Sequence, residues 1–411
     1  MEEKKFSAYA AGPNHKDWEA LIKREGDLYT RSDDIRSPFA RDYTRVLHSM
    51  AYRRMKHKTQ VFFNGAGNDH ICTRIEHVAH VESVSHTIAK TLGLNEELTS
   101  AIALAHDIGH APFGHQGEAV LSKITQKWFG ERFWHEKNGV YFVDSVELLE
   151  DNSNCLKNME LTFAVRNGII SHCGEMDKNC LKPSEKLMDP YAYERPGHYE
   201  AATWEGCIVK LADKIAYLGR DIQDALMIGG LIDDKGLKLL QDMASTYDQK
   251  AINTTVIMHN MILSICKEST PEEGLKLSDE MSEQMNAIKK FNYENIYNNK
   301  RMQAFKRYSE LVLTELFDYL MSFYKGVYTL YKIDENNYDG HFFVKDFADW
   351  IIRYVDDNAV PNALQLKNDK CRNKKIYGRL EDEKVFARAV VDYIAGMTDP
   401  YAIKCYEDLL L

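Results

Sequence analysis

The chain has 411 residues, of which 44% are hydrophobic and 28% charged, a balance typical of a globular protein with a large core. Its net charge of −10 argues against a protein that binds nucleic acids or anionic membranes through its overall charge. The first residues lack the apolar segment of a signal peptide, and no apolar run is long enough to span a bilayer. We therefore expect a cytoplasmic protein whose eight cysteines, none in a CxxC pair, are reduced thiols.

Apolar residues at helical spacing recur along the chain and predict a mainly α-helical protein with few short strands. The best strand candidate is TQVFFN at 59–64. One helix is expected to end near Gly93, and the next to begin with Asn95 as its N-cap. This second helix is expected to carry His106 and to end or bend at Pro112, whose ring cannot continue the hydrogen-bond ladder. Further helices are expected near 211–226, 303–325 and 383–396, and irregular connectors at 174–198, 331–341 and 366–377.

The stretch HDIGHAPFGH at 106–115 places three of the 15 histidines within ten residues, beside an aspartate. His106 and Asp107 are adjacent on the expected helix, so their side chains diverge by roughly 100° around its axis. An ion with octahedral coordination, seated over that helix, could accept both side chains. His77 and Asp213, from other expected helices, are the candidates for two further ligands.

The expected helix around Asp213 has two distinct faces. Its apolar face is formed by Leu211, Ile215, Leu218, Ile222 and Leu226. Its polar face is formed by Asp213, Tyr217 and Asp221, which recur every four residues. Such a polar face either lines a liganded site or is solvated, and the spacing alone leaves both interpretations open. A set of two imidazoles and two carboxylates favours Fe, Mn, Co, Ni or Zn over Ca.

Five segments in a fixed order carry a resemblance to a known family. They are RSPFARDYTRVLHSMAYRRMKHKTQVF within 31–63, TRIEHVAHV, AIALAHDIGHAPFGHQGE, LADKIAYLGRDIQDA and VVDYIAGMTDPYA. Together they resemble the HD superfamily of metal-dependent phosphohydrolases. More narrowly they resemble its deoxynucleoside triphosphate (dNTP) triphosphohydrolases, the dGTPase-like branch that includes the mammalian SAM-and-HD-domain dNTPase. Strong similarity covers about 31–226.

The resemblance implies an HD-type helical core with additional C-terminal helices. We expect an N-terminal arm at 1–40, the phosphohydrolase core at 41–230, and a helical region at 231–411 that packs on the core and contributes to oligomerisation. Also implied are a homo-oligomer, a tetramer or hexamer, and a second, activating nucleotide. The basic segment AYRRMKHK at 51–58 is interpreted as a structural brace, with an allosteric nucleotide contact or a solvated helix face as alternatives.

The reaction implied by the resemblance is attack of water on the α-phosphorus of a dNTP, which yields a deoxynucleoside and inorganic triphosphate. One divalent metal ion, Mn, Fe, Co, Ni, Zn or Mg, would be held by His77, His106, Asp107 and Asp213. Such an ion can polarise the phosphorus, activate water, or do both.

His115 and Glu118 are three residues apart, and they share one face if a helix restarts after Pro112. A carboxylate that holds one imidazole nitrogen fixes the tautomer and raises the basicity of the other nitrogen. The resemblance assigns His115 as the acid/base or nucleophile-positioning residue and Glu118 as its orienting partner. His110 lies one turn after His106 on the expected helix and resembles the family's histidine that contacts the α-phosphate.

The resemblance assigns six further residues to the substrate. Gln60 and Asp221 would bind the 3′-hydroxyl, and Tyr217 would stack its ring under the sugar and exclude a 2′-hydroxyl. Arg74 and Lys214 would bind phosphates, and His135 would be a further active-site histidine. The segment around His135, FWHEKNG, departs from the family's commoner HNAQ form, which makes its assignment weaker.

Two other functions compete with this one. The first is another HD nucleotide phosphohydrolase, a monophosphatase or phosphodiesterase, which would not need the segment at 31–63 or the C-terminal motif. The second is a nucleotide-sensing or single-stranded-DNA-binding protein with a vestigial HD site. Its best feature is the basic loop Lys367–Lys375, whose cations could follow a phosphate backbone. The overall negative charge disfavours this second alternative.

Overall fold

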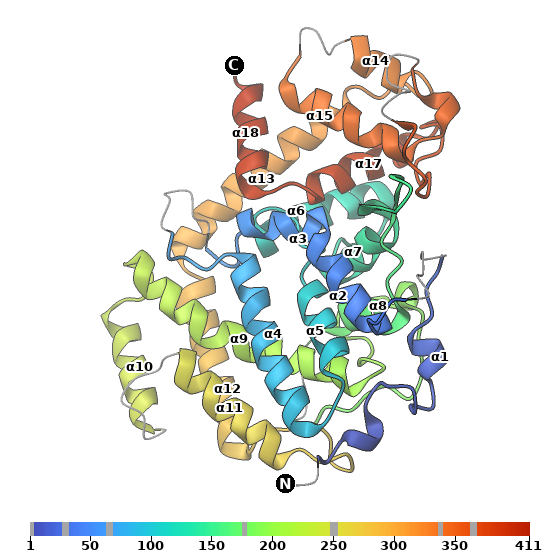
Figure 1. The fold of residues 1–411 in the computed structure, drawn as a ribbon. Coiled ribbons are helices and arrows are strands. Elements are labelled where there is room, and N and C mark those ends of the chain that lie inside the picture. The colour runs from blue at the N-terminus through green and yellow to red at the C-terminus, as the bar shows by residue number, and fades with distance from the viewer. Residues whose placement is uncertain are drawn as a thin grey trace. The chain divides into compact units, whose positions relative to one another are not determined.

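The computed structural model describes residues 4–26, 33–62, 69–174, 179–246, 254–335, 340–361 and 368–411. Within these ranges the protein is mainly helical, with one two-stranded sheet, which confirms the expected fold class (Figure 1). The chain forms two compact units, each assembled from separate stretches of sequence. The first unit comprises 1–47, 59–107 and 161–304, and the second comprises 48–58, 108–160 and 305–411.

The first unit is built around three long helices that pack against one another, α4 (Arg74–Leu92), α5 (Glu96–Ala105) and α9 (Trp204–Ile228). Helix α8 (Phe163–Ser171) packs on both α5 and α9. The unit also contains α1 (Trp18–Leu21), α2 (Pro38–His48), α10 (Asp234–Thr246), α11 (Thr254–Glu268) and α12 (Asp279–Asn292). Short 3₁₀ helices lie at Ser7–Tyr9 and Pro190–Ala192, and a π-helix lies at Tyr293–Tyr297.

Local sequence signals define the ends of α4 and α5 largely as predicted. Helix α4 ends before Gly93, whose φ of 87° is a left-handed conformation that glycine adopts without strain. Asn95 caps α5 by accepting a hydrogen bond from the Leu98 amide at 3.0 Å. The expectation that His106 lies within this helix was wrong, because α5 ends at Ala105 and His106 is its C-cap. The His106 side chain bonds the Ala103 carbonyl, which is the acceptor that a further helical residue would use.

The apolar face predicted for α9 is confirmed over most of its length, because Leu211, Ile215, Leu218 and Ile222 are all buried. The prediction was wrong for Leu226, which is 47% exposed. Its neighbour Met227 is exposed as well, so the apolar face of α9 is covered only up to its last turn.

The second unit contains α3 (Met50–Arg54), α6 (Gly114–Phe129), α7 (His135–Tyr141), α14 (Thr329–Glu335), α15 (Phe342–Ile351), α17 (Glu383–Ala395) and α18 (Asp399–Leu409). Helix α13 (Lys300–Met321) begins in the first unit and continues into the second. Strands β1 (Leu148–Glu150) and β2 (Leu156–Asn158) pair antiparallel. Short 3₁₀ helices lie at Met55–His57, Ile352–Tyr354 and Asp357–Ala359, and a π-helix lies at Phe142–Val146. Within this unit α17 packs on α6 and α15.

Helices α13 and α17 confirm the predictions near 303–325 and 383–396, whereas two other expectations were wrong. Residues 59–62 form no strand, and 63–64 lie outside the described residues. The carbonyls of Thr59 and Gln60 accept instead from the Arg74 guanidinium, which removes acceptors that a strand partner would need. Residues 331–335, expected to be part of a connector at 331–341, belong instead to α14, and 336–339 lie outside the described residues.

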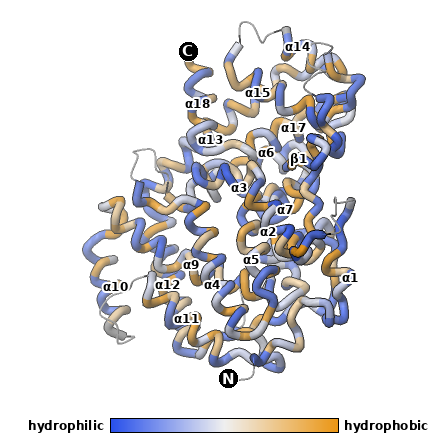
Figure 2. Tube along the Cα trace, viewed as in Figure 1, coloured by the Kyte–Doolittle hydropathy of each residue, from blue (hydrophilic) through white to orange (hydrophobic). Residues whose placement is uncertain are grey.

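Polar and apolar residues alternate along the helices, as expected for elements that bury one face each (Figure 2). Across the described ranges, none of the helices combines the length and the apolar character needed to cross a membrane. Four of the cysteines are buried: Cys72, Cys207, Cys371 and Cys405.

Candidate functional site

The four predicted metal ligands lie together in the first unit. His77 comes from α4, His106 caps α5, Asp107 follows it in a turn, and Asp213 comes from α9. Asp213 Oδ1 lies 2.9 Å from His77 Nε2 and 3.9 Å from His106 Nε2. Asp107 reaches the two imidazoles with different oxygens, at 3.8 Å from His77 and 3.5 Å from His106. Donor atoms about 2.1 Å from one ion lie about 3–4 Å apart, so these spacings are those of a metal site.

The protonation of these residues also suits a divalent cation. The Nδ1 atom of His106 lies 2.7 Å from the Ala103 carbonyl, so it carries the proton and Nε2 keeps a lone pair. This Nε2 is buried and has no hydrogen-bond partner among the described residues. Burial raises the pKa of the Asp213 carboxyl, but the hydrogen bond and the charge of His77 outweigh burial and lower the pKa to about 2. A charged carboxylate beside an orphaned imidazole nitrogen is chemistry that a metal ion would satisfy.

The two cations expected to bind phosphates have protein partners. Arg74 is buried and forms an ion pair with Asp107 through Oδ2, and it donates to the Gln60 carbonyl at 3.1 Å. Lys214, next to Asp213 on α9, donates to the Gly174 carbonyl at 2.7 Å. Their roles in phosphate binding stay predictions.

Two of the residues expected at the sugar, Tyr217 and Asp221, lie one turn apart on α9. Asp221 is buried, and burial raises its pKa to about 7. The Tyr297 hydroxyl donates to Asp221 Oδ2, a contact that sequence reasoning missed because 76 residues separate the partners. Tyr217, one turn before Asp221, is half-buried. The side-chain oxygen of Gln60 is buried and without a hydrogen-bond partner among the described residues.

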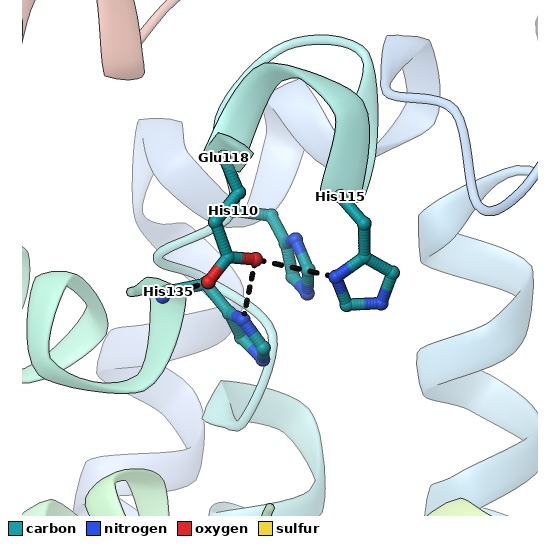
Figure 3. A group of neighbouring side chains, drawn as sticks. All are labelled: His110, His115, Glu118 and His135. Atoms are coloured by element: carbon teal, nitrogen blue, oxygen red, sulfur yellow. Dashed lines mark hydrogen bonds and ion pairs between the residues drawn. The ribbon is translucent and has the colours of Figure 1, made fainter. Parts of the chain in front are cut away.

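The second unit carries a cluster of three histidines around one glutamate (Figure 3). Glu118 and His115 lie on the first turns of α6, and His115 Nδ1 is 3.2 Å from Glu118 Oε2, which confirms the predicted pairing. The same oxygen lies 3.0 Å from Nδ1 of His135, the first residue of α7. The His135 amide donates to the other oxygen of Glu118 at 3.2 Å. The His110 ring stacks on His135, with 3.8 Å between the ring centroids.

Glu118 therefore orients two imidazoles. Burial would raise the pKa of its carboxyl, but the charges and hydrogen bonds of His135 and His115 hold that pKa well below its usual range. A carboxylate that stays ionised can keep a proton on the nitrogen facing it and leave the other nitrogen of each ring for proton transfer. His115 is the exposed member of the cluster, whereas His135 is buried. The cluster also has the dimensions of a metal-binding group.

The helical argument for His110 was wrong, because α5 ends before it and His110 lies outside any helix. Other contacts place it. Lys58 donates from Nζ to the carbonyls of His110 and, at 3.0 Å, of Ala395. Phe113 has a φ of 64°, and its amide donates to Asp399 at 2.8 Å. Lys58, at the end of the basic segment 51–58, and the C-terminal motif thus hold the same segment. The brace expected of 51–58 as a whole stays a prediction.

Gly109 allows this segment to approach α7 closely. A Cβ atom at this position would lie 2.1 Å from the His135 carbonyl oxygen and 2.2 Å from the Gly139 nitrogen. The Gly109 carbonyl accepts from the side chain of Asn138 at 2.7 Å. A glycine in the HDIGH motif is therefore required by backbone packing within the second unit.

His172 is a further buried residue near the predicted ligands that the sequence analysis did not single out. Its Nε2 lies 3.9 Å from Asp107 Oδ1, and its ring centroid lies 4.9 Å from that of His106. The segment SHCG around it contains no spacing that links it to the HD pair, so only the fold reveals the contact.

The described part of the basic loop is held by neighbours from its own unit. Lys375 lies 3.5 Å from Asp357 and donates to Asn368 at 3.0 Å. Lys367, at the start of the loop, lies outside the described residues.

Comparison with known proteins agrees with this geometry. Residues 74–218 match the HD domain, and residues 275–325 and 322–408 match the phosphohydrolase-associated domain. A deoxyguanosinetriphosphate triphosphohydrolase-like protein of Caldanaerobacter subterraneus subsp. tengcongensis is 32% identical over 379 residues, which cover 92% of this chain and 86% of that protein. A protein of the same name from Clostridium tetani is 30% identical over 406 residues, which cover 98% of this chain and 93% of that protein. Another, from Desulfatibacillum aliphaticivorans, is 36% identical over 296 residues, which cover 70% of this chain and 74% of that protein. The chain therefore belongs to the HD-domain phosphohydrolases, in the family of deoxyguanosinetriphosphate triphosphohydrolase-like proteins.

Proposed function

We propose that this phosphohydrolase is a metal-dependent dNTP triphosphohydrolase, which converts a dNTP and water into a deoxynucleoside and inorganic triphosphate. The observation that carries the proposal is the buried group of His77, His106, Asp107 and Asp213, in which His106 presents an unpartnered nitrogen. The names of the relatives, which specify deoxyguanosine triphosphate, support a deoxynucleotide substrate.

The four ligands would hold one divalent ion, whose identity stays open among Mn, Fe, Co, Ni, Zn and Mg. When bound, such an ion supplies a Lewis acid for a phosphate oxygen and lowers the pKa of coordinated water. Two carboxylates and two imidazoles form a mixed oxygen and nitrogen ligand set that suits a divalent transition-metal ion.

In this proposal water attacks the α-phosphorus, and the bond from phosphorus to the 5′ oxygen breaks. His115, as the imidazolium, gives its Nε2 proton to the leaving 5′ oxygen, while Glu118 accepts a hydrogen bond from Nδ1 and orients the ring. The proton that the attacking water loses returns the imidazole to its protonated form. His110 contacts the α-phosphate, and His135, held by the same carboxylate, contacts the substrate beside it.

The remaining assignments concern binding of the substrate. Gln60 and Asp221 would hold the 3′-hydroxyl, and the Tyr217 ring would stack on the sugar and exclude a 2′-hydroxyl. Arg74 and Lys214 would meet the phosphates, which requires them to exchange some of their protein partners for phosphate oxygens. Such exchange is plausible chemistry because a guanidinium binds carboxylate and phosphate with the same geometry.

Chromatography of products after incubation with each dNTP, singly and mixed, tests the reaction. Deoxynucleoside with intact triphosphate supports attack at the α-phosphorus, whereas inorganic phosphate or a linear monophosphate would favour another HD phosphohydrolase. Mixed dNTPs also test for the proposed second, activating nucleotide. Light scattering with and without dNTP tests the proposed tetramer or hexamer, to which residues 231–411 would contribute.

Two variants separate metal binding from proton transfer. We expect Asp213→Ala to lose both bound metal and turnover, because it removes a ligand. His115→Ala should keep its metal content and lose turnover. Full activity of the His115 variant would refute its assignment, and loss of metal from it would identify the cluster around Glu118 as a metal site instead.

A further inference from the structure

His172 and His106 are placed in the same way. His106 is the C-cap of α5, and its Nδ1 lies 2.7 Å from the carbonyl of Ala103, three residues earlier. His172 is the C-cap of α8, and its Nδ1 lies 2.7 Å from the carbonyl of Ile169, also three residues earlier. A carbonyl can only accept, so both rings carry their proton on Nδ1 and turn Nε2 away from the helix end.

The helices that carry these two histidines pack against each other within the first unit. Both rings are buried, and the centroids lie 4.9 Å apart at an interplanar angle of 77°. The C-terminal end of a helix has a partial negative charge and stabilises a nearby cation. The C-terminal ends of α5 and α8 therefore lie close together, and each carries an imidazole whose Nε2 is free of a proton and can bind a metal ion.

Asp107 lies between the donors with its two oxygens facing different residues. Oδ2 faces Arg74 and His77, whereas Oδ1 lies 3.5 Å from His106 Nε2 and 3.9 Å from His172 Nε2. The donor atoms of His106, Asp107 and His172 all lie within 4.8 Å of one another. Donors about 2.1 Å from one ion lie about 3 Å apart when adjacent and about 4.2 Å apart when opposite, so this trio has metal-site dimensions.

We propose that His172 is a fifth protein ligand of the metal ion, in addition to His77, His106, Asp107 and Asp213. This inference rests on the metal site of the proposed function and extends it. Five protein donors, three nitrogens and two oxygens, would leave one position of an octahedral ion for water or a phosphate oxygen.

The competing interpretation is that His172 is only an ion-pair partner of Asp107. Arg74 already neutralises that carboxylate from the other oxygen. A second protein cation there would oppose the entry of a divalent ion, whereas a neutral ligand would favour it. The alignment of Nδ1 with a backbone carbonyl is also the arrangement that fixes histidine ligands in metal sites.

The test uses the full-length protein stripped with a chelator and reloaded with Mn²⁺. Pulsed electron paramagnetic resonance counts the imidazole nitrogens on Mn²⁺, and a titration gives the dissociation constant. We expect three imidazoles in the unaltered protein and two in His172→Gln, with affinity weakened at least about tenfold. His86→Gln, which changes another histidine beside a carboxylate, Glu96 at 3.4 Å, should alter neither value.

Two imidazoles in the unaltered protein, or an unchanged count in His172→Gln, would overturn the inference. The count in the unaltered protein needs no variant, so a folding defect of His172→Gln does not block the test. If Asp213→Ala binds Mn²⁺ as tightly as the unaltered protein, the metal site of the proposed function fails. If Asp213→Ala loses Mn²⁺ while the imidazole count is two, the role of His172 alone fails.

Discussion

The buried Lys58 offers a direct test of how the histidine-bearing segment is held in the second unit. Its Nζ donates to the carbonyls of His110 and Ala395, and only 4% of the residue is exposed. Lys58→Met keeps a similar volume but leaves both carbonyls without this donor. A buried acceptor that loses a charged donor costs about 1.5–3 kcal/mol, so for two acceptors we expect the free energy of unfolding to fall by about 3–6 kcal/mol. Turnover should fall as well, because His110 loses its anchor.

Urea unfolding of the full chain, followed by circular dichroism, measures this change. Lys56→Met is the matched control, because Lys56 is exposed and lies two residues away. We expect the control to change the unfolding free energy by less than about 0.5 kcal/mol. A loss below about 1 kcal/mol in Lys58→Met would refute the reasoning, since it would mean that the two carbonyls find other donors at little cost.

Two further predictions concern the same unit. In Gly109→Ala the new Cβ would meet backbone atoms at 2.1 and 2.2 Å, which should displace α7 and move His135 away from Glu118. We expect lower turnover and a loss of about 2 kcal/mol or more in the free energy of unfolding. Gly12→Ala, whose Cβ would meet its nearest atom at 3.9 Å, is the control. Burial raises the pKa of Asp392 from 3.8 to about 6, so the folded state favours the protonated carboxyl. This preference contributes about 3 kcal/mol to the free energy of unfolding. The contribution is present below pH 3.8 and is lost as the pH rises through 6. Unfolding measured between pH 4 and 7 should show this loss in the unaltered protein and not in Asp392→Asn, and equal pH profiles would contradict the prediction.

Signals that are local in sequence were read correctly. The cap at Asn95, the end of α4 at Gly93 and the restart of a helix before His115 each depend on residues a few positions apart. The pairing of His115 with Glu118 belongs to the same class, because three residues on a helix fix the geometry. The four candidate ligands were proposed from a resemblance that spans several helices.

Contacts made across long sequence separations were missed. His172 and Asp107 are brought together by the packing of α8 on α5, and Tyr297 reaches Asp221 from the turn after α12. The end of α5 was misplaced for a different reason, since the His106 side chain competes for the Ala103 carbonyl. Helical periodicity contains no information about such competition, and at a ligand site the side chain prevails over propensity.

The C-terminal match to a phosphohydrolase-associated domain gains a physical meaning from the second unit. Asp399 accepts from the amide of Phe113, a residue with positive φ, and Ala395 shares the Lys58 ammonium with His110. A left-handed non-glycine residue costs about 1 kcal/mol or more and persists only where its surroundings enforce it. Residues near the end of the chain thus supply that enforcement for a segment nearly 300 residues earlier. The C-terminal motif is therefore part of what builds the cluster around Glu118. A change there should disturb turnover without changing the metal binding that we propose for His77, His106, Asp107 and Asp213.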